Sequence, residues 1–458
     1  MAERPTFTSV ISNRGFRFLW FNQILVQLAY NTLNFALIVW VFKLIGSNLA
    51  VSALMLSIYL PVMLFGIFAG VFVDLSDRRR IIIFIDLLLA IAFLFFLFIK
   101  RSFPLILVNT FLVNSLAQFF MPSESSSIPL LVSRKQLFLA NSLFSLTLYG
   151  AFMVGFSISG PILNTFGLNA VFYLGAAMLA GAFLLAQNLP TIKVKGSRNF
   201  LESLSWVNLK KMFRLTQNEA KETFEFIRGK LSVATAIALM AAVQGVIGVM
   251  AVLLPAYLER VLLIHATDAS YFMILPLGLG MILGALVVGK LFHNTPKRRI
   301  VIPAVIASGI LLVLAGVVPT LAQIFQSAEL PIHLIRPRYF FRAPSLSTLF
   351  AFIAFLSGIA LVSIIIPTQT VLQENTNESN RGKIFAVLAV IMTAVSAIPV
   401  ILAGGLSELF GVKPIFIGLG AAIFILGIVV WRPRYFFPGG VLPYRIRCFL
   451  GLGHWMKE

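Results

Sequence analysis

Four amide side chains recur at helical spacing in the first long apolar run of the chain. Steps of four, four and three residues place this set on one helix face: Gln23, Gln27, Asn31 and Asn34, with Tyr30 beside them. Unpaired amides are costly in hydrocarbon, so the stripe must face protein or a water-filled cavity. Hydrogen bonding between helices, without any ligand, is the alternative. Because four amides exceed what packing usually requires, we interpret the stripe as a cavity lining.

Carboxyl groups are scarce within the apolar runs. Of the 16 acidic residues, only Asp86 falls clearly inside such a run, about two turns beyond Arg80. An ionisable group in this setting is a candidate functional site, and Asp86 could carry a proton. The alternative is a structural ion pair with an arginine such as Arg79. The expected cavity is otherwise neutral, which suits a hydrophobic or amphipathic molecule.

Motifs for enzymatic chemistry are missing from the sequence. The run from Gly284 to Lys290 mimics a phosphate-binding loop, but Leu291 stands where Ser or Thr is needed, and no strand precedes it. The four histidines are scattered, and Cys448 is the single cysteine, so no metal site is expected. No nucleophile and base are placed together within the apolar runs. We therefore expect neither an enzyme nor a cofactor.

The elements that position these residues are predicted to be membrane-spanning helices. The chain is 59% hydrophobic and only 11% charged, against about 25% charged in soluble domains. Long apolar runs without alternation indicate helices, because the backbone must satisfy its own hydrogen bonds in lipid. Twelve spans are predicted: 18–43, 51–73, 81–99, 104–121, 142–163, 170–188, 231–257, 270–289, 300–318, 346–366, 384–406 and 414–431.

The basic residues predict how these spans are oriented. With both termini in the cytoplasm, 28 of the 36 lysines and arginines fall in cytoplasmic segments and 8 on the opposite side. Their clustering between apolar runs also argues against a nucleic-acid partner, despite a net charge of +20. The predicted organisation is a six-helix bundle over 1–188, a cytoplasmic linker over 189–230, a second bundle over 231–431 and a cytoplasmic tail over 432–458.

A short pattern occurs once in each half of the chain. After the second span, Gly70 is followed by Asp74 and by the basic triplet Arg78 to Arg80. After the eighth span, Gly289 is followed at the same spacing by His293 and by the triplet Lys297 to Arg299. Two related six-helix halves are typical of transporters built from repeats.

These residues resemble the major facilitator superfamily, whose signature follows the second helix. The resemblance narrows to the drug:proton antiporter family that includes macrolide and enterobactin exporters. The matching stretches are Gly46-Ser47, Ala50-Val51, Asp77 to Arg80, Asp86 to Leu88, Pro122, Ile128-Pro129, Ala140-Asn141, Gly160-Pro161, Thr370, Gln373-Glu374 and Arg381 to Lys383.

The resemblance implies roles for several of these positions. It implies a gating motif of Gly70, Asp74, Arg78, Arg79 and Arg80, with a repeat-related gating loop of Gly289, Arg298 and Arg299. In the closed state Asp74 would contact the start of helix 11 at Arg381, Gly382 and Lys383. A helix 5 hinge would include Gly160 and Pro161. Further cavity-lining residues would be Asn114, Gln118 and Gln244.

From these features we expect a secondary active transporter. It would export a hydrophobic or amphipathic small molecule, such as a drug, a macrolide or a siderophore-like compound, by alternating access with proton coupling. The alternatives are a lipid or lysolipid translocator and a non-transporting receptor on the same scaffold. The expected partners are the small-molecule substrate, the lipid bilayer and protons, with no nucleic acid. We expect a monomeric, multi-pass protein of the cell (inner or plasma) membrane.

Overall fold

The computed structural model describes residues 6–74, 76–191, 216–217, 221–223, 225, 227, 231–291, 295–327, 346–374 and 381–431. Apart from one isolated β-bridge residue, Ser76, every regular element in these ranges is a helix. Within these ranges, eleven helices are long and apolar enough to cross a membrane. The prediction of an all-α polytopic protein is therefore confirmed. Most of the predicted linker and the whole predicted tail lie outside the described residues.

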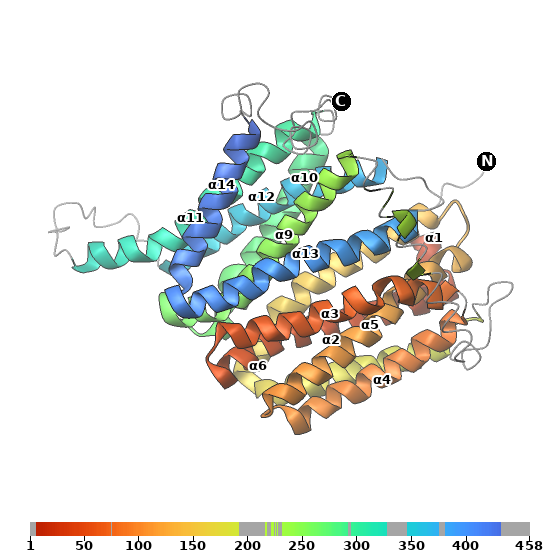
Figure 1. Cartoon of the computed structure of the whole chain (residues 1–458). Coiled ribbons are helices and arrows are strands. Elements are labelled where there is room, and N and C mark those ends of the chain that lie inside the picture. Colours follow the sequence, from red (N-terminus) through yellow and green to blue (C-terminus); the bar gives the residue numbers. More distant parts are fainter. Residues whose placement is uncertain are drawn as a thin grey trace, which may run out of the picture. The chain divides into compact units, whose positions relative to one another are not determined.

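The described residues of the first half form six helices up to residue 187. They are α1 (Phe7–Ile11), α2 (Arg14–Ile45), α3 (Asn48–Asp74), α4 (Arg78–Ile99), α5 (Phe103–Leu131) and α6 (Leu137–Gln187). Local sequence sets the ends of α2: the Asn13 side chain accepts a hydrogen bond from the Phe16 amide, and Gly46 adopts φ 73°, which favours glycine. Within this half, α2 packs along α6 and also contacts α5 (Figure 1).

Helix α6 contains two of the predicted spans. Its apolar portion, Leu139–Gln187, has 49 residues, which would extend for about 70 Å as one straight helix, more than twice the thickness of a bilayer core. The backbone leaves helical geometry at Gly167, with φ 76° and ψ 177°. This break separates the predicted spans 142–163 and 170–188, so eleven candidate helices accommodate twelve predicted spans.

Two predicted helix ends are wrong for the same reason. The fourth span was predicted to end at residue 121, but α5 continues through Pro122 and Pro129 to Leu131. The tenth was predicted to end at residue 366, but α12 continues through Pro367 to Glu374. Proline is tolerated in membrane helices because neighbouring groups satisfy the carbonyl that it leaves free. Because α5 extends beyond its predicted end, Glu124 lies inside a helix rather than in a loop.

The described residues of the second half form six long helices and a short irregular region. The elements are α9 (Leu231–Tyr257), η1 (Leu258–Leu262), η2 (Ala266–Asp268), η3 (Ser270–Ile274), α10 (Leu275–Leu291), α11 (Lys297–Ser327), α12 (Leu346–Glu374), α13 (Arg381–Phe410) and α14 (Val412–Trp431). Helices α10 and α12 approach closely at two glycines: a Cβ on Gly280 would lie 1.9 Å from the Phe355 carbonyl oxygen, and one on Gly358 2.1 Å from that of Leu277. Small residues allow such contacts between membrane helices.

The chain forms two compact units. One comprises Met1–Gly46, Ala50–Phe226 and Glu378–Ala397, and the other comprises Ser47–Leu49, Ile227–Asn377 and Ile398–Glu458. Each unit encloses its own apolar core, while large apolar side chains such as Phe98, Leu286 and Leu409 are more than 60% exposed. Exposure of this kind suits a surface that faces lipid.

Candidate functional site

The amide stripe of α2 lies inside the first compact unit. Gln23, Gln27, Asn31 and Asn34 are all buried, at 4–9% exposure. Gln23 Nε2 donates to the Phe144 carbonyl on α6 at 3.4 Å, and Asn31 Nδ2 donates to the Gln27 carbonyl one turn earlier at 2.8 Å. The stripe therefore faces protein rather than lipid. A cavity-lining role for it stays a prediction.

Helix α6 approaches the stripe very closely at one glycine. A Cβ built on Gly155 would lie 2.8 Å from the Asn31 Cβ and 3.2 Å from the Thr32 amide nitrogen. Nearby, the Ser159 hydroxyl donates to the Thr32 carbonyl at 3.0 Å. A side chain larger than that of glycine would therefore not fit at position 155 without a shift of α2 or α6.

A series of hydrogen bonds connects Tyr30, beside the stripe, to α5. The Tyr30 hydroxyl donates to Asn114 Oδ1, and Asn114 Nδ2 donates to the Thr110 carbonyl at 2.8 Å. Gln118 Nε2 donates to the Asn114 carbonyl at 3.4 Å, which extends the series by one turn. Two of the predicted cavity residues on α5 are thus joined to Tyr30. Gln244, on α9 of the other unit, is exposed.

Asp86 on α4 is completely buried and has an amide as its partner. Asn22 Nδ2 donates to Asp86 Oδ2 at 2.6 Å and also to the Ala182 carbonyl on α6 at 2.8 Å. Arg79, the predicted alternative partner, instead donates to the Gln187 carbonyl at 2.5 Å. No ion pair among the described residues includes Asp86. The structural ion pair therefore does not form there.

A second buried carboxyl group, that of Glu124, was missed in the sequence. It is 3% exposed on α5 and interacts electrostatically with Asp86. Sequence reasoning placed it in a loop because the fourth span was ended at Pro122. The available signal was the run of apolar residues that resumes at Ile128, which indicates that the helix continues past the proline. Asn22 was missed because it lies one residue before the stripe.

The basic triplet at the start of α4 joins several helix ends. Arg78 Nη2 lies 3.4 Å from Asp74 Oδ1, and Arg78 Nη1 donates to the Ser126 carbonyl on α5 at 2.8 Å. Arg80 Nε lies 3.6 Å from Asp77 Oδ2, and the Asp77 side chain accepts from the Arg80 amide at the first turn of α4. In the structure, this motif connects the ends of α3, α4, α5 and α6.

The residues of the predicted gate lie at the end of α3 and at the start of α13. The Asp74 side chain is 62% exposed and paired with Arg78. An added Cβ on Gly70 would meet nothing within 4 Å. Arg381, Gly382 and Lys383 form the first turn of α13, and their side chains lie outside the described residues. Contact between Asp74 and this turn stays a prediction.

The equivalent pattern in the second half makes related contacts. Lys297 forms an ion pair with Glu374 at the end of α12, and Arg298 Nη2 donates to the Val430 carbonyl on α14 at 2.9 Å. Arg299 is exposed, and an added Cβ on Gly289 would meet nothing within 4 Å. The second triplet therefore also joins helix ends within its own unit.

The predicted helix 5 hinge lies within α6. Gly160 and Pro161 belong to its first half, and the backbone departs from helical geometry at Gly167. The kink therefore lies six residues beyond Pro161. A hinge motion at Gly160 and Pro161 stays a prediction.

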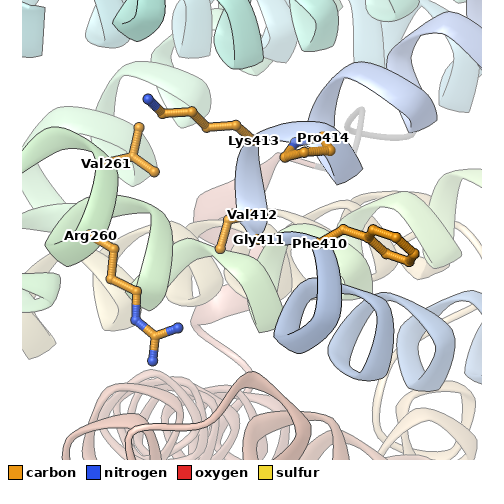
Figure 2. A pocket seen from close by; sticks show the side chains of 7 residues that line it. All are labelled: Arg260, Val261, Phe410, Gly411, Val412, Lys413 and Pro414. Atoms are coloured by element: carbon orange, nitrogen blue, oxygen red, sulfur yellow. The ribbon is translucent and has the colours of Figure 1, made fainter.

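One pocket lies at the junction of α13 and α14, with a volume of about 260 Å³. It is lined by Arg260, Val261, Phe410, Gly411, Val412, Lys413 and Pro414. Figure 2 shows the guanidinium of Arg260 and the ammonium of Lys413 pointing in different directions, so the two charges do not converge on one point. The amide stripe and the buried carboxyl groups belong to the other compact unit.

Sequence comparison identifies a family and a relative. Residues 19–329 match the model of the Major Facilitator Superfamily. An uncharacterised transporter of this type, YfiS from Bacillus subtilis (strain 168), is 24% identical over 396 residues, which are 85% of each chain.

Solved structures share the fold at low sequence identity. A POT family transporter in complex with 5-aminolevulinic acid has a TM-score of 0.69 at 12% identity, covering 92% of this chain and 96% of its own. The nucleoside transporter NupG, as a point mutant, has a TM-score of 0.62 at 14% identity, covering 90% and 99%. At this level of identity these similarities concern the fold alone, and they extend over at least 90% of this chain.

Proposed function

The chain belongs to the major facilitator superfamily, and on that basis we propose that this membrane transporter exports a hydrophobic or amphipathic small molecule by proton-coupled alternating access. One observation carries the choice of cargo. The polar groups inside the first unit are uncharged over most of its depth, because Gln23, Gln27, Asn31 and the Tyr30–Asn114 pair supply amides and a hydroxyl. A multiply charged cargo would find no counter-charge there.

The position of the buried acids supports proton coupling. Asp86 and Glu124 lie near one end of the first unit, eight residues after the start of α4 and seven before the end of α5. A group that carries protons can act there without meeting the cargo among the amides. This separation suits a transporter in which proton and cargo occupy different places.

Transport by purified protein in proteoliposomes tests this function. Ethidium, Hoechst 33342 and erythromycin would serve as lipophilic probes, each with and without an imposed pH gradient. Accumulation of any probe that collapses when a protonophore removes the gradient supports proton-coupled export. Binding of a probe without flux would overturn it in favour of the non-transporting receptor.

A lipid translocator is the second candidate. Dithionite quenching of a fluorescent lysophosphatidylcholine in the same vesicles shows in which leaflet the lipid lies. This measurement separates a lipid translocator from a drug exporter. Movement of the lysolipid without movement of any lipophilic probe would replace drug export by lipid translocation. The orientation, the cell-membrane location and the monomeric state are part of the same proposal.

A further inference from the structure

We propose that Asp86 and Glu124 form one coupled proton-binding site, in which Asn22 positions Asp86 and which takes up and releases the proton during transport. This inference rests on the proposed proton-coupled function and assigns the residues that carry the proton. Glu124 and Asn22 enter it from the structure, since neither was singled out in the sequence.

Both carboxyl groups of the proposed site are buried. Asp86 is 0% exposed and Glu124 is 3% exposed. Among the described residues, Asp86 Oδ1 and Glu124 Oε1 have no hydrogen-bond partner. A buried carboxylate without compensation is costly, and the cost disappears when the group binds a proton. These two oxygens are therefore sites where a proton can be held.

The two carboxyl groups also interact with each other. They lie on adjacent helices, α4 and α5, and act on each other electrostatically. Like charges in a low-dielectric interior repel each other, so ionisation of one group favours a proton on the other. Such groups titrate in two macroscopic steps that belong to the pair rather than to either residue.

Few charged groups lie on the helices that pack around Asp86 and Glu124. The charged groups on the elements packed nearby are Arg14, Arg17 and Lys43 on α2, Arg78, Arg79 and Arg80 on α4, and Asp74 and Asp77 just before α4. α6 contains no charged residue, and α5 none besides Glu124. The triplet is engaged with Asp74, the Ser126 and Gln187 carbonyls and Asp77. None of the ion pairs among the described residues neutralises either acid.

Asn22 is the positioning residue. Its Nδ2 contacts both Asp86 Oδ2 and the Ala182 carbonyl, which fixes the amide between α4 and α6. Its Oδ1 is buried without a partner among the described residues, so it is available to accept a hydrogen bond from a proton donor. One amide can thus donate to the charged form of the site and accept from the group that brings the proton. In each cycle a hydronium ion would give its proton to a carboxylate, leaving water and a carboxylic acid, and the acid would return it to water on the other side.

Infrared titration of the full chain in lipid nanodiscs tests the pair without any cargo. The carbonyl stretch of a carboxylic acid is distinct from the carboxylate bands, so each protonation step can be counted. Besides the titration of the other 14 acidic residues, wild type should show two steps that belong to the pair. Asp86→Asn and Glu124→Gln should each remove one step and move the other, and the double variant should remove both. A double variant with both steps intact, or single variants whose remaining step does not move, would overturn the pair.

Control variants keep this test interpretable. Asp77→Asn removes a buried carboxylate that already has Arg80 as its partner, so both steps should remain. Asp86→Glu and Glu124→Asp keep the carboxyl groups and should keep two steps even where the isosteric amides fold poorly. Asn22→Ala should move the midpoint of a step while leaving two, which a purely structural role would not do.

Ethidium flux in proteoliposomes tests the coupling itself. Asp86→Asn and Glu124→Gln should lose accumulation driven by a pH gradient but keep downhill equilibration of ethidium. If these variants accumulate ethidium as wild type does, the pair does not couple transport. If wild type moves no probe at all, the proposed function fails, and the infrared titration alone decides whether the proton site exists.

Discussion

Arg79 and Arg298 make the same contact in the two halves of the chain. Each is the middle residue of a basic triplet, and each donates to a carbonyl at the end of the last helix of its own half: Arg79 to Gln187 at 2.5 Å and Arg298 to Val430 at 2.9 Å. The last carbonyls of a helix have no partner within the helix, so a cation there satisfies them and complements the helix dipole. The repeat found in the sequence therefore corresponds to a repeated contact in the structure.

Loss of this contact in either half should reduce the stability of the protein by a similar amount. Arg79→Met and Arg298→Met keep much of the side-chain bulk but remove the donor, so each should reduce stability by about 1.5–3 kcal/mol, the range for hydrogen bonds to charged groups. Thermal unfolding in detergent, followed by intrinsic fluorescence, measures the effect. Arg299→Met is the control, because Arg299 is exposed. An equal effect of all three changes would contradict the role of the middle arginine.

The predicted orientation can be tested at positions that the structure selects. Asn48 is a poor labelling site, because it is fully buried and its Nδ2 donates to Ser407 Oγ at 3.0 Å. Leu49 is 49% exposed and Ser133 is exposed. In a Cys448→Ser background, Leu49→Cys should react with an impermeant maleimide from outside, and Ser133→Cys only after the membrane is opened. Labelling of both from one side would contradict the twelve-span topology.

The helices were predictable from the sequence because their signal is local. Each long apolar run must form a helix in lipid, and the structure places a helix at every predicted span within the described residues. The errors lie where a local signal was overridden. The prolines at 122 and 367 predict that the preceding spans end, but neighbouring helices allow α5 and α12 to continue through them.

The pairing of side chains could not be predicted in the same way. Asp86 stood out as a lone acid in an apolar run, but its contacts with Asn22 and Glu124 depend on how α2, α4 and α5 pack together. Asn22 and Glu124 are 64 and 38 positions away from Asp86 in the chain. The sequence favoured a local partner, Arg79, because residues one or two turns apart on a helix are neighbours.

The cavity prediction rests on the buried stripe of α2. Gln27→Leu or Asn31→Leu should slow export, or change which of the three lipophilic probes is preferred, while insertion is retained because leucine suits lipid at least as well. Initial rates in proteoliposomes, at equal amounts of reconstituted protein, measure the effect. Gln244→Leu applies the same test to the cavity residue predicted in the other unit, where its side chain is exposed. Normal rates for both stripe variants would mean that the amides serve packing only.

The gate prediction concerns Asp74, which is largely exposed and has Arg78 one turn away at 3.4 Å. We expect its carboxylate to stabilise the state closed to the cytoplasm by binding the start of α13. A charge-assisted contact contributes about 1.5–3 kcal/mol, so its loss should shift the equilibrium roughly tenfold to a hundredfold. Asp74→Asn keeps the shape and removes the charge, and it should slow turnover and raise the cytoplasmic accessibility of Gln27→Cys to a maleimide.

Two further variants separate charge from bulk at this gate. Gly70 has open space around it, so Gly70→Val should be tolerated in folding and act only when another helix closes on that face. Asp77 caps α4 and pairs with Arg80, and Asp77→Asn keeps an oxygen that can accept from the Arg80 amide. Its neutralisation should therefore affect turnover less than Asp74→Asn does. Full transport by Asp74→Asn with unchanged accessibility, or a larger defect from Asp77→Asn, would show that the exposed carboxylate does not control the gate.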